Sequence, residues 1–307
     1  MHNLPFTSPA AVLAGLVTVC LCSAAIPAQT APTQSAPVAH KPAAPAQPAS
    51  KVANPDELLA KANNLYYSYA KDGLEGFECT VHPDWKQIVL LANKDVPGAA
   101  DEAEVKLLNR VKVTMHAHLA GESTLDWDQP PAGNAATGSD ADSGDAADLL
   151  NGMHQTTQQT LLGFIQFWMP FINGSIVPNS SRGLEITQSA KGYRIVASQG
   201  GSTVTERFDS NLMLQNFHVA MEGMKVSFDP AYTTTEKGLL VSSFTSNIEL
   251  PGTESAPKPA AGPEMKVAIE YQTVDGFPVP ASLSMEKVNA GTFSFAFDGC
   301  KVNRFPK

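Results

Sequence analysis

Two closely spaced histidines have the residue type and spacing that a metal site could use. His116 and His118 stand two positions apart in an alternating apolar and polar stretch, so a strand would place both imidazoles on one face. Imidazole nitrogens are common zinc ligands, but a zinc site needs three or four ligands. His82, His154 and His218 stand at no recognisable spacing from this pair. We therefore interpret the pair as the polar side of a strand, and we expect no metal and no cofactor.

A short acidic stretch at residues 140–145, with the sequence DADSGD, has some of the character of a calcium loop. A calcium loop requires glycine at its sixth position and a bidentate glutamate at its twelfth. Those two positions hold Asp145 and Asn151. The stretch is better interpreted as part of a solvated acidic linker.

The chain contains none of the sequence patterns that would indicate an enzyme. We find no Gly-x-Ser-x-Gly, no Ser-x-x-Lys in a workable setting, no zinc-protease pattern and no phosphate loop. The stretch QGGS at residues 199–202 is typical of a hairpin turn. We expect a non-catalytic protein, and the alternative is a catalytic triad that only the fold brings together.

The most apolar segment is LLGFIQFWMPFI, at residues 161–172. As a helix it is apolar on every side, so it is either buried all round or faces a hydrophobic ligand or membrane surface. It is too short to span a bilayer. Two interpretations stay open, a fully packed core and a pocket between helix and sheet. The second makes these the ligand-binding residues: Leu161, Phe164, Ile165, Phe167, Trp168, Met169, Phe171 and Ile172.

The net charge of the chain is -9, from 21 Lys and Arg against 30 Asp and Glu. The segment between Lys112 and Arg182 contains no Lys or Arg. Its acidic residues are Glu122, Asp126, Asp128, Asp140, Asp142, Asp145 and Asp148. Nucleic acids and anionic membranes attract clustered basic side chains. The balance therefore predicts no cationic patch and no nucleic-acid partner.

The first residues predict export. Residues 10–26 form an apolar run followed by small residues, so we expect a signal peptide over 1–28, cut after Ala28, and a periplasmic or secreted protein. The residues before the run include no Lys or Arg, so a retained N-terminal anchor is the alternative. Residues 29–54 are rich in Ala and Pro, and we expect a disordered tether there.

Two cysteines remain after the predicted signal peptide, Cys79 and Cys300. An even number of cysteines in an exported chain favours a disulfide between them. The alternative is two buried free thiols.

Residues 55–307 are predicted to form a single domain. A helix begins at Pro55 and ends at Gly73, an acidic loop covers 129–148, and a second helix begins at Asp148. From Gly183 onward, short alternating runs are separated by turn residues, which is typical of antiparallel strands. We predict an α+β fold: a large curved antiparallel sheet, forming an incomplete barrel, with helices packed on its concave face.

This order of elements resembles the periplasmic lipoprotein-carrier superfamily, with its LolA/LolB-like fold, over about residues 55–303. The resemblance lies in the opening helix ending YYSYAKDGLEGFECTVHPDW and in the closing strands YQTVDGFPVPASLSMEKVNAGTFSFAFDGCKVN. Within the closing strands, residues 274–280 are similar to the turn before the penultimate strand in that superfamily. The resemblance implies an incomplete barrel of strands plugged by helices.

These patterns together predict an exported, non-catalytic binding protein for a hydrophobic ligand, such as a lipid or a lipoprotein acyl chain. We expect a monomer whose partner is that ligand or a lipidated protein, with transient contact with a membrane surface. The alternative is a cell-envelope structural or protein-interaction module without a small-molecule ligand.

Overall fold

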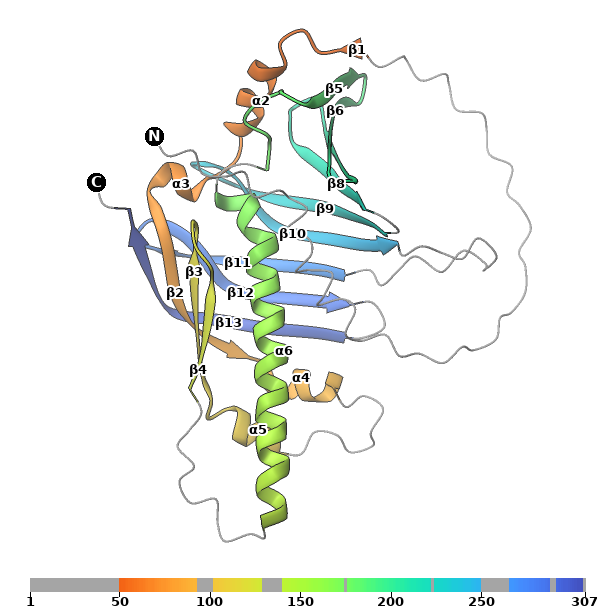
Figure 1. Ribbon diagram of the computed structural model, residues 1–307. Coiled ribbons are helices and arrows are strands. Elements are labelled where there is room, and N and C mark those ends of the chain that lie inside the picture. Colours follow the sequence, from red (N-terminus) through yellow and green to blue (C-terminus); the bar gives the residue numbers. More distant parts are fainter. Residues whose placement is uncertain are drawn as a thin grey trace, which may run out of the picture.

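The computed structural model describes residues 50–92, 102–128, 140–173, 176–221, 224–249, 265–287 and 291–305. The predicted signal peptide, most of the predicted tether and the first part of the predicted acidic loop lie outside these residues. Figure 1 shows the described elements in the order of the chain.

One antiparallel sheet dominates the described part of the chain, and its order is β1-β5-β6-β7-β8-β9-β10-β11-β12-β13-β2-β3-β4. The sheet is open, because β1 and β4 are its two ends (Figure 1). The large antiparallel sheet of an α+β fold is therefore confirmed. Its strands are β1 (Ser50–Lys51), β2 (Leu74–Pro83), β3 (Lys112–His118), β4 (Thr124–Asp128), β5 (Leu184–Ser189), β6 (Gly192–Gln199), β7 (Ser202–Phe208), β8 (Leu214–Met221), β9 (Met224–Thr235), β10 (Gly238–Glu249), β11 (Met265–Val274), β12 (Phe277–Lys287) and β13 (Gly291–Arg304).

Turn residues connect the later strands, as the sequence predicts. Asp275 and Gly276 link β11 to β12 and have φ angles of 50° and 84°. A two-residue hairpin turn with both residues at positive φ matches the twist of the flanking strands, and Asp-Gly is a favoured sequence for it. Val274 therefore pairs directly with Phe277.

The first predicted helix is interrupted. It forms as α2 (Pro55–Asn63) and a short α3 (Tyr69–Asp72), which ends at Gly73 as predicted. Between them the backbone bonds to β10: the Leu239 amide donates to the Leu65 carbonyl at 2.7 Å, and the Tyr67 amide donates to the Leu239 carbonyl at 2.9 Å. The prediction of one continuous helix is wrong because this long-range pairing replaces helical bonds.

The prediction of a disordered tether over residues 29–54 is wrong near its C-terminal end. Ser50 and Lys51 form β1 and pair with Gln188 and Thr187 of β5. The exposed edge of β5 offers backbone hydrogen bonds that composition alone does not reveal.

Helix α6 (Asp140–Asn173) is longer than predicted. It begins at Asp140, so the acidic loop predicted over 129–148 is wrong from that residue onward, and residues 129–139 lie outside the described part. Acidic residue types are favourable in the first turn of a helix because the helix dipole is positive there. Figure 1 shows α6 running across the strands of the sheet.

Two smaller helices, α4 (Trp85–Ala92) and α5 (Glu102–Leu108), follow β2 and precede β3. Strand β2, near the start of the described chain, pairs with β13, the last strand. Cys79 on β2 and Cys300 on β13 lie within disulfide distance, with their sulfur atoms 2.10 Å apart. Of the two interpretations of these cysteines, the disulfide is the one confirmed, and it links residues 221 positions apart.

Candidate functional site

All of the predicted ligand-binding residues lie on the last turns of α6. Seven of them are buried, and Met169 is half-buried. Gln166, in the middle of the same turns, is exposed. The helix therefore contacts the core on almost every side, as a helix without a polar face must.

Trp168 connects α6 to three strands of the sheet through hydrogen bonds and ring packing. Its indole nitrogen donates a hydrogen bond to the hydroxyl oxygen of Tyr271 on β11 at 2.9 Å. The Tyr271 hydroxyl donates in turn to the carbonyl of Val241 on β10 at 2.5 Å. The Trp168 ring also packs edge to face against Phe77 of β2, with 6.1 Å between ring centroids. Its buried polar atom is satisfied, so Trp168 is a structural anchor of the helix.

Phe167 faces a second group of aromatic rings. Its ring centroid lies 4.5 Å from that of Phe228 on β9 and 4.3 Å from that of Phe244 on β10. Phe217 on β8 continues this surface, 6.0 Å from Phe228. The sheet thus presents an aromatic wall to α6, formed by Phe217, Phe228 and Phe244.

A buried carboxylic acid lies in this wall. Glu206 on β7 is directly opposite Phe217 on one side and Ile195 on the other. Only 7% of its surface is exposed, and its Oε2 atom has no hydrogen-bond partner within the described residues. Burial raises the pKa of Glu206 to about 8, so the carboxyl holds its proton at neutral pH. A protonated carboxyl is a hydrogen-bond donor in apolar surroundings.

Two tyrosines share the surroundings of Glu206. The Tyr66 hydroxyl accepts a hydrogen bond from the Leu214 amide at 2.7 Å, and its ring packs against Tyr232 at 5.5 Å between centroids. Burial raises the pKa of Tyr66 to about 12 and raises the pKa of Tyr232 further. The charge of Glu206 would raise both pKa values, although by less than burial does. We name Glu206, Tyr66 and Tyr232 the Glu206 cluster.

A surface depression opens beside this cluster. It has a volume of about 350 Å³ and lies at the segment that separates α2 from α3. Tyr66 is part of its wall, so the depression reaches one member of the Glu206 cluster. Its lining residues are Asn64, Tyr66, Tyr67, Ser68, Lys71, Asp72 and Lys237.

The sequence analysis missed Glu206, although a signal was present. In the run 202–208 the apolar positions alternate, and Glu206 stands between Val204 and Phe208 in the same phase. An acid in the buried phase of a strand indicates a perturbed group. It was overlooked because no spacing motif contains it.

The two histidines of the pair, His116 and His118, lie on the polar face of β3. The Nε2 atom of His116 lies 3.0 Å from Oδ2 of Asp126, and its Nδ1 atom lies 3.4 Å from Oε2 of Glu78. These acids come from the strands on either side of β3. In the described part of the chain, no group of three or more His, Cys, Asp and Glu residues is placed to hold a metal ion.

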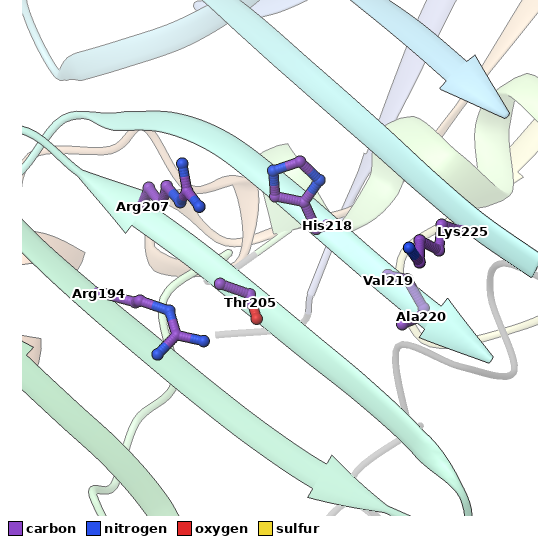
Figure 2. A pocket seen from close by; sticks show the side chains of 7 residues that line it. All are labelled: Arg194, Thr205, Arg207, His218, Val219, Ala220 and Lys225. Carbon is purple, nitrogen blue, oxygen red and sulfur yellow. The ribbon is translucent and has the colours of Figure 1, made fainter. Parts of the chain in front are cut away.

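The prediction that no cationic patch forms is wrong. A second depression, of about 260 Å³, lies over strands β6 to β9 (Figure 2). Basic side chains from separate strands meet there, because sheet pairing brings together residues that are distant in the sequence. Its lining residues are Arg194, Thr205, Arg207, His218, Val219, Ala220 and Lys225.

The chain matches no family model, no curated protein and no solved structure. Among the described residues, no helix combines the length and the apolar character that a membrane crossing requires. The function has therefore to be inferred from the geometry of the residues themselves.

Proposed function

We propose that this protein is an exported, non-catalytic binding protein for a hydrophobic ligand with a polar end, such as a lipid or a lipoprotein acyl chain. The ligand binds between the last turns of α6 and the aromatic wall. The observation that carries the proposal is the carboxyl of Glu206, which is buried in that wall and has an oxygen without a partner in the described residues. An unsatisfied buried polar group is costly, so its retention favours a role in binding.

In this proposal α6 occupies the site when no ligand is bound. The sheet curves around the helix, and the helix packs on its concave face as a plug. An acyl chain entering beside Phe167 replaces the contacts of that ring with Phe228 and Phe244. Apolar burial at about 25 cal/mol per Å² then compensates for the contacts that the helix gives up.

The Glu206 cluster receives the polar end of the ligand. The protonated carboxyl of Glu206 donates a hydrogen bond to an ester or amide carbonyl, the group that joins an acyl chain to its carrier. The depression lined by Tyr66 supplies the entrance. The general resemblance to the lipoprotein-carrier superfamily supports the same class of ligand.

The experiment is a binding titration of the delipidated full chain with a fluorescent fatty acid. We expect saturable binding, and we expect Glu206→Leu to weaken it about fivefold, because one hydrogen bond contributes about 1 kcal/mol. Glu185→Leu is the matched control: it makes the same change at an exposed position of β5 and leaves binding unchanged. If the unmodified chain binds no probe, or if Glu206→Leu binds it equally well, the proposed site is wrong.

A second candidate is a protein-interaction module, and the open edge of the sheet favours it. Among the described strands β4 has one neighbour, β3, so its outer edge can pair with a strand of a partner. Absence of probe binding together with co-purification of a partner protein would support this alternative.

A further inference from the structure

The depression over β6 to β9 concentrates positive charge in an acidic protein. It lies on the face of the sheet opposite the aromatic wall, because Arg207 alternates with the buried Glu206 and Phe208 along β7. Arg194 joins Arg207 from the neighbouring strand β6, and Lys225 from β9, which lies beyond β8. Figure 2 shows the two arginines toward one end of the group and Lys225 toward the other.

The two arginines stand directly opposite each other. Arg194 of β6 is the register partner of Arg207 of β7, and both side chains are exposed. Like charges at directly opposite positions of a sheet destabilise it. Neither guanidinium has a hydrogen bond or an ion pair within the described residues. This arrangement has a cost that an anion bound between the two groups would remove.

Polar groups complete the depression. Thr205 is two residues from Arg207 on the same face, and it is the register partner of His218 on β8. A hydroxyl and an imidazole therefore lie in the row next to the arginine pair. The hydroxyl, the imidazole and the two guanidinium groups therefore line the same depression.

Two acids on this face, Asp229 and Glu185, lie near the arginines, and neither forms an ion pair with them in the described part of the chain. Asp229 accepts a hydrogen bond from the side-chain nitrogen of Asn216. Asn216 is the register partner of Arg207, so it stands between that arginine and Asp229. Glu185 of β5 pairs with Val196, in the row beside that of Arg194. A third acid, Glu249 of β10, is the register partner of Lys225, at the end of the depression away from the arginines. The residues that line the depression itself are basic or neutral.

From this geometry we propose that the depression binds a phosphate group, with Arg194 and Arg207 as its principal ligands. Guanidinium groups present paired N–H donors that match two oxygens of a phosphate. Cβ atoms of opposite residues lie about 4.5–5.5 Å apart, so both side chains can reach one phosphate. The site is on the other face of the sheet from the proposed acyl site, and it does not depend on that proposal.

The first test measures binding of inorganic phosphate to the full chain, by calorimetry and by the thermal unfolding midpoint at constant ionic strength. We expect phosphate to bind and to raise the midpoint. Arg194→Gln/Arg207→Gln should weaken binding at least about tenfold, because charge-assisted hydrogen bonds are lost. Lys86→Gln/Arg110→Gln removes the same charge from an exposed position in α4 and one after α5, and it should bind as the unmodified chain does.

The second test separates the sources of the phosphate. Vesicles of phosphatidylcholine alone are compared with vesicles that also contain phosphatidylglycerol. Binding of inorganic phosphate without vesicle binding indicates a soluble phosphorylated ligand. Added binding to the anionic vesicles, lost in the double arginine variant, indicates a lipid headgroup.

The proposal is wrong if phosphate gives no more effect than chloride at equal ionic strength, or if the double arginine variant keeps the effect. Circular dichroism checks that the variants are folded. If the double variant does not fold, Arg194→Gln and Arg207→Gln are measured singly, and each must weaken phosphate binding for the proposal to stand.

Discussion

Glu206 and Arg207 are neighbours in the chain, yet they lie in opposite environments. Glu206 points into the aromatic wall beside Phe217 and is almost fully buried. Arg207 points to the other face, stands opposite Arg194 and is exposed. The alternation of a single strand separates the two charged residue types.

The difference shows how the two faces accommodate an unfavourable charge. On the buried face the cost of an ion is high, so the Glu206 carboxyl keeps its proton and its pKa is raised. On the exposed face, water and salt screen the repulsion between Arg194 and Arg207, so both stay charged. One face is thus suited to a neutral polar end of an apolar ligand, and the other to an anion.

The largest expected effect is a difference in stability between the two faces. Phe228→Ala should lower the free energy of unfolding by about 3–5 kcal/mol, because it removes a buried ring from the aromatic wall. Arg207→Ala should change it by about 0.5 kcal/mol or less, because the side chain is exposed. Urea denaturation of both variants measures this, and equal effects would contradict the assignment of the two faces.

An intermediate effect should appear in the pH dependence of stability. The pKa of Glu206 is raised from 4.5 to about 8 on folding, so the folded chain holds this proton more tightly than the unfolded chain does. The contribution of Glu206 to stability is therefore complete below 4.5, falls as the pH rises toward about 8, and is constant above that. Glu206→Gln cannot titrate, so it should become progressively more stable than the unmodified chain across this window.

Denaturation series at several pH values measure this difference. Glu185→Gln, an exposed acid on the other face, is the control and should follow the pH profile of the unmodified chain. Parallel profiles for Glu206→Gln and the unmodified chain would show that Glu206 is not buried in the folded protein.

The smallest expected effect is on the exposed face. Arg207→Glu places an acid opposite Arg194 and should raise the free energy of unfolding by about 0.2–1 kcal/mol at low salt. High salt should remove the gain, since exposed charges are screened. Arg110→Glu, after α5, is the control for the change in net charge. A gain in the free energy of unfolding that persists at high salt would not come from attraction between the introduced acid and Arg194.

Local sequence patterns predicted many of the elements correctly. Alternating residues indicated the strands after Gly183, and turn residues between the alternating runs indicated that the strands are antiparallel. These features depend on neighbouring residues only. The end of α3 at Gly73 was predicted for the same reason, because glycine adopts positive φ readily.

Long-range pairing explains what the sequence did not predict. The helix expected between Pro55 and Gly73 is interrupted because Leu65 and Tyr67 bond to Leu239. The depression with Arg194 and Arg207 was missed because their opposition depends on the register of two strands. The number of charged residues in the chain gives no information about that register.

The sequence by itself determined that the segments after Gly183 are strands and which face of each strand is apolar. Both follow from alternation along the strand, which is a local property. Only the tertiary structure decided which strands are neighbours, so it alone placed Cys79 beside Cys300, Glu206 beside Phe217 and Arg194 beside Arg207. The physical reason is that burial and repulsion depend on distances between residues far apart in the chain. Both proposed sites arise from those distances.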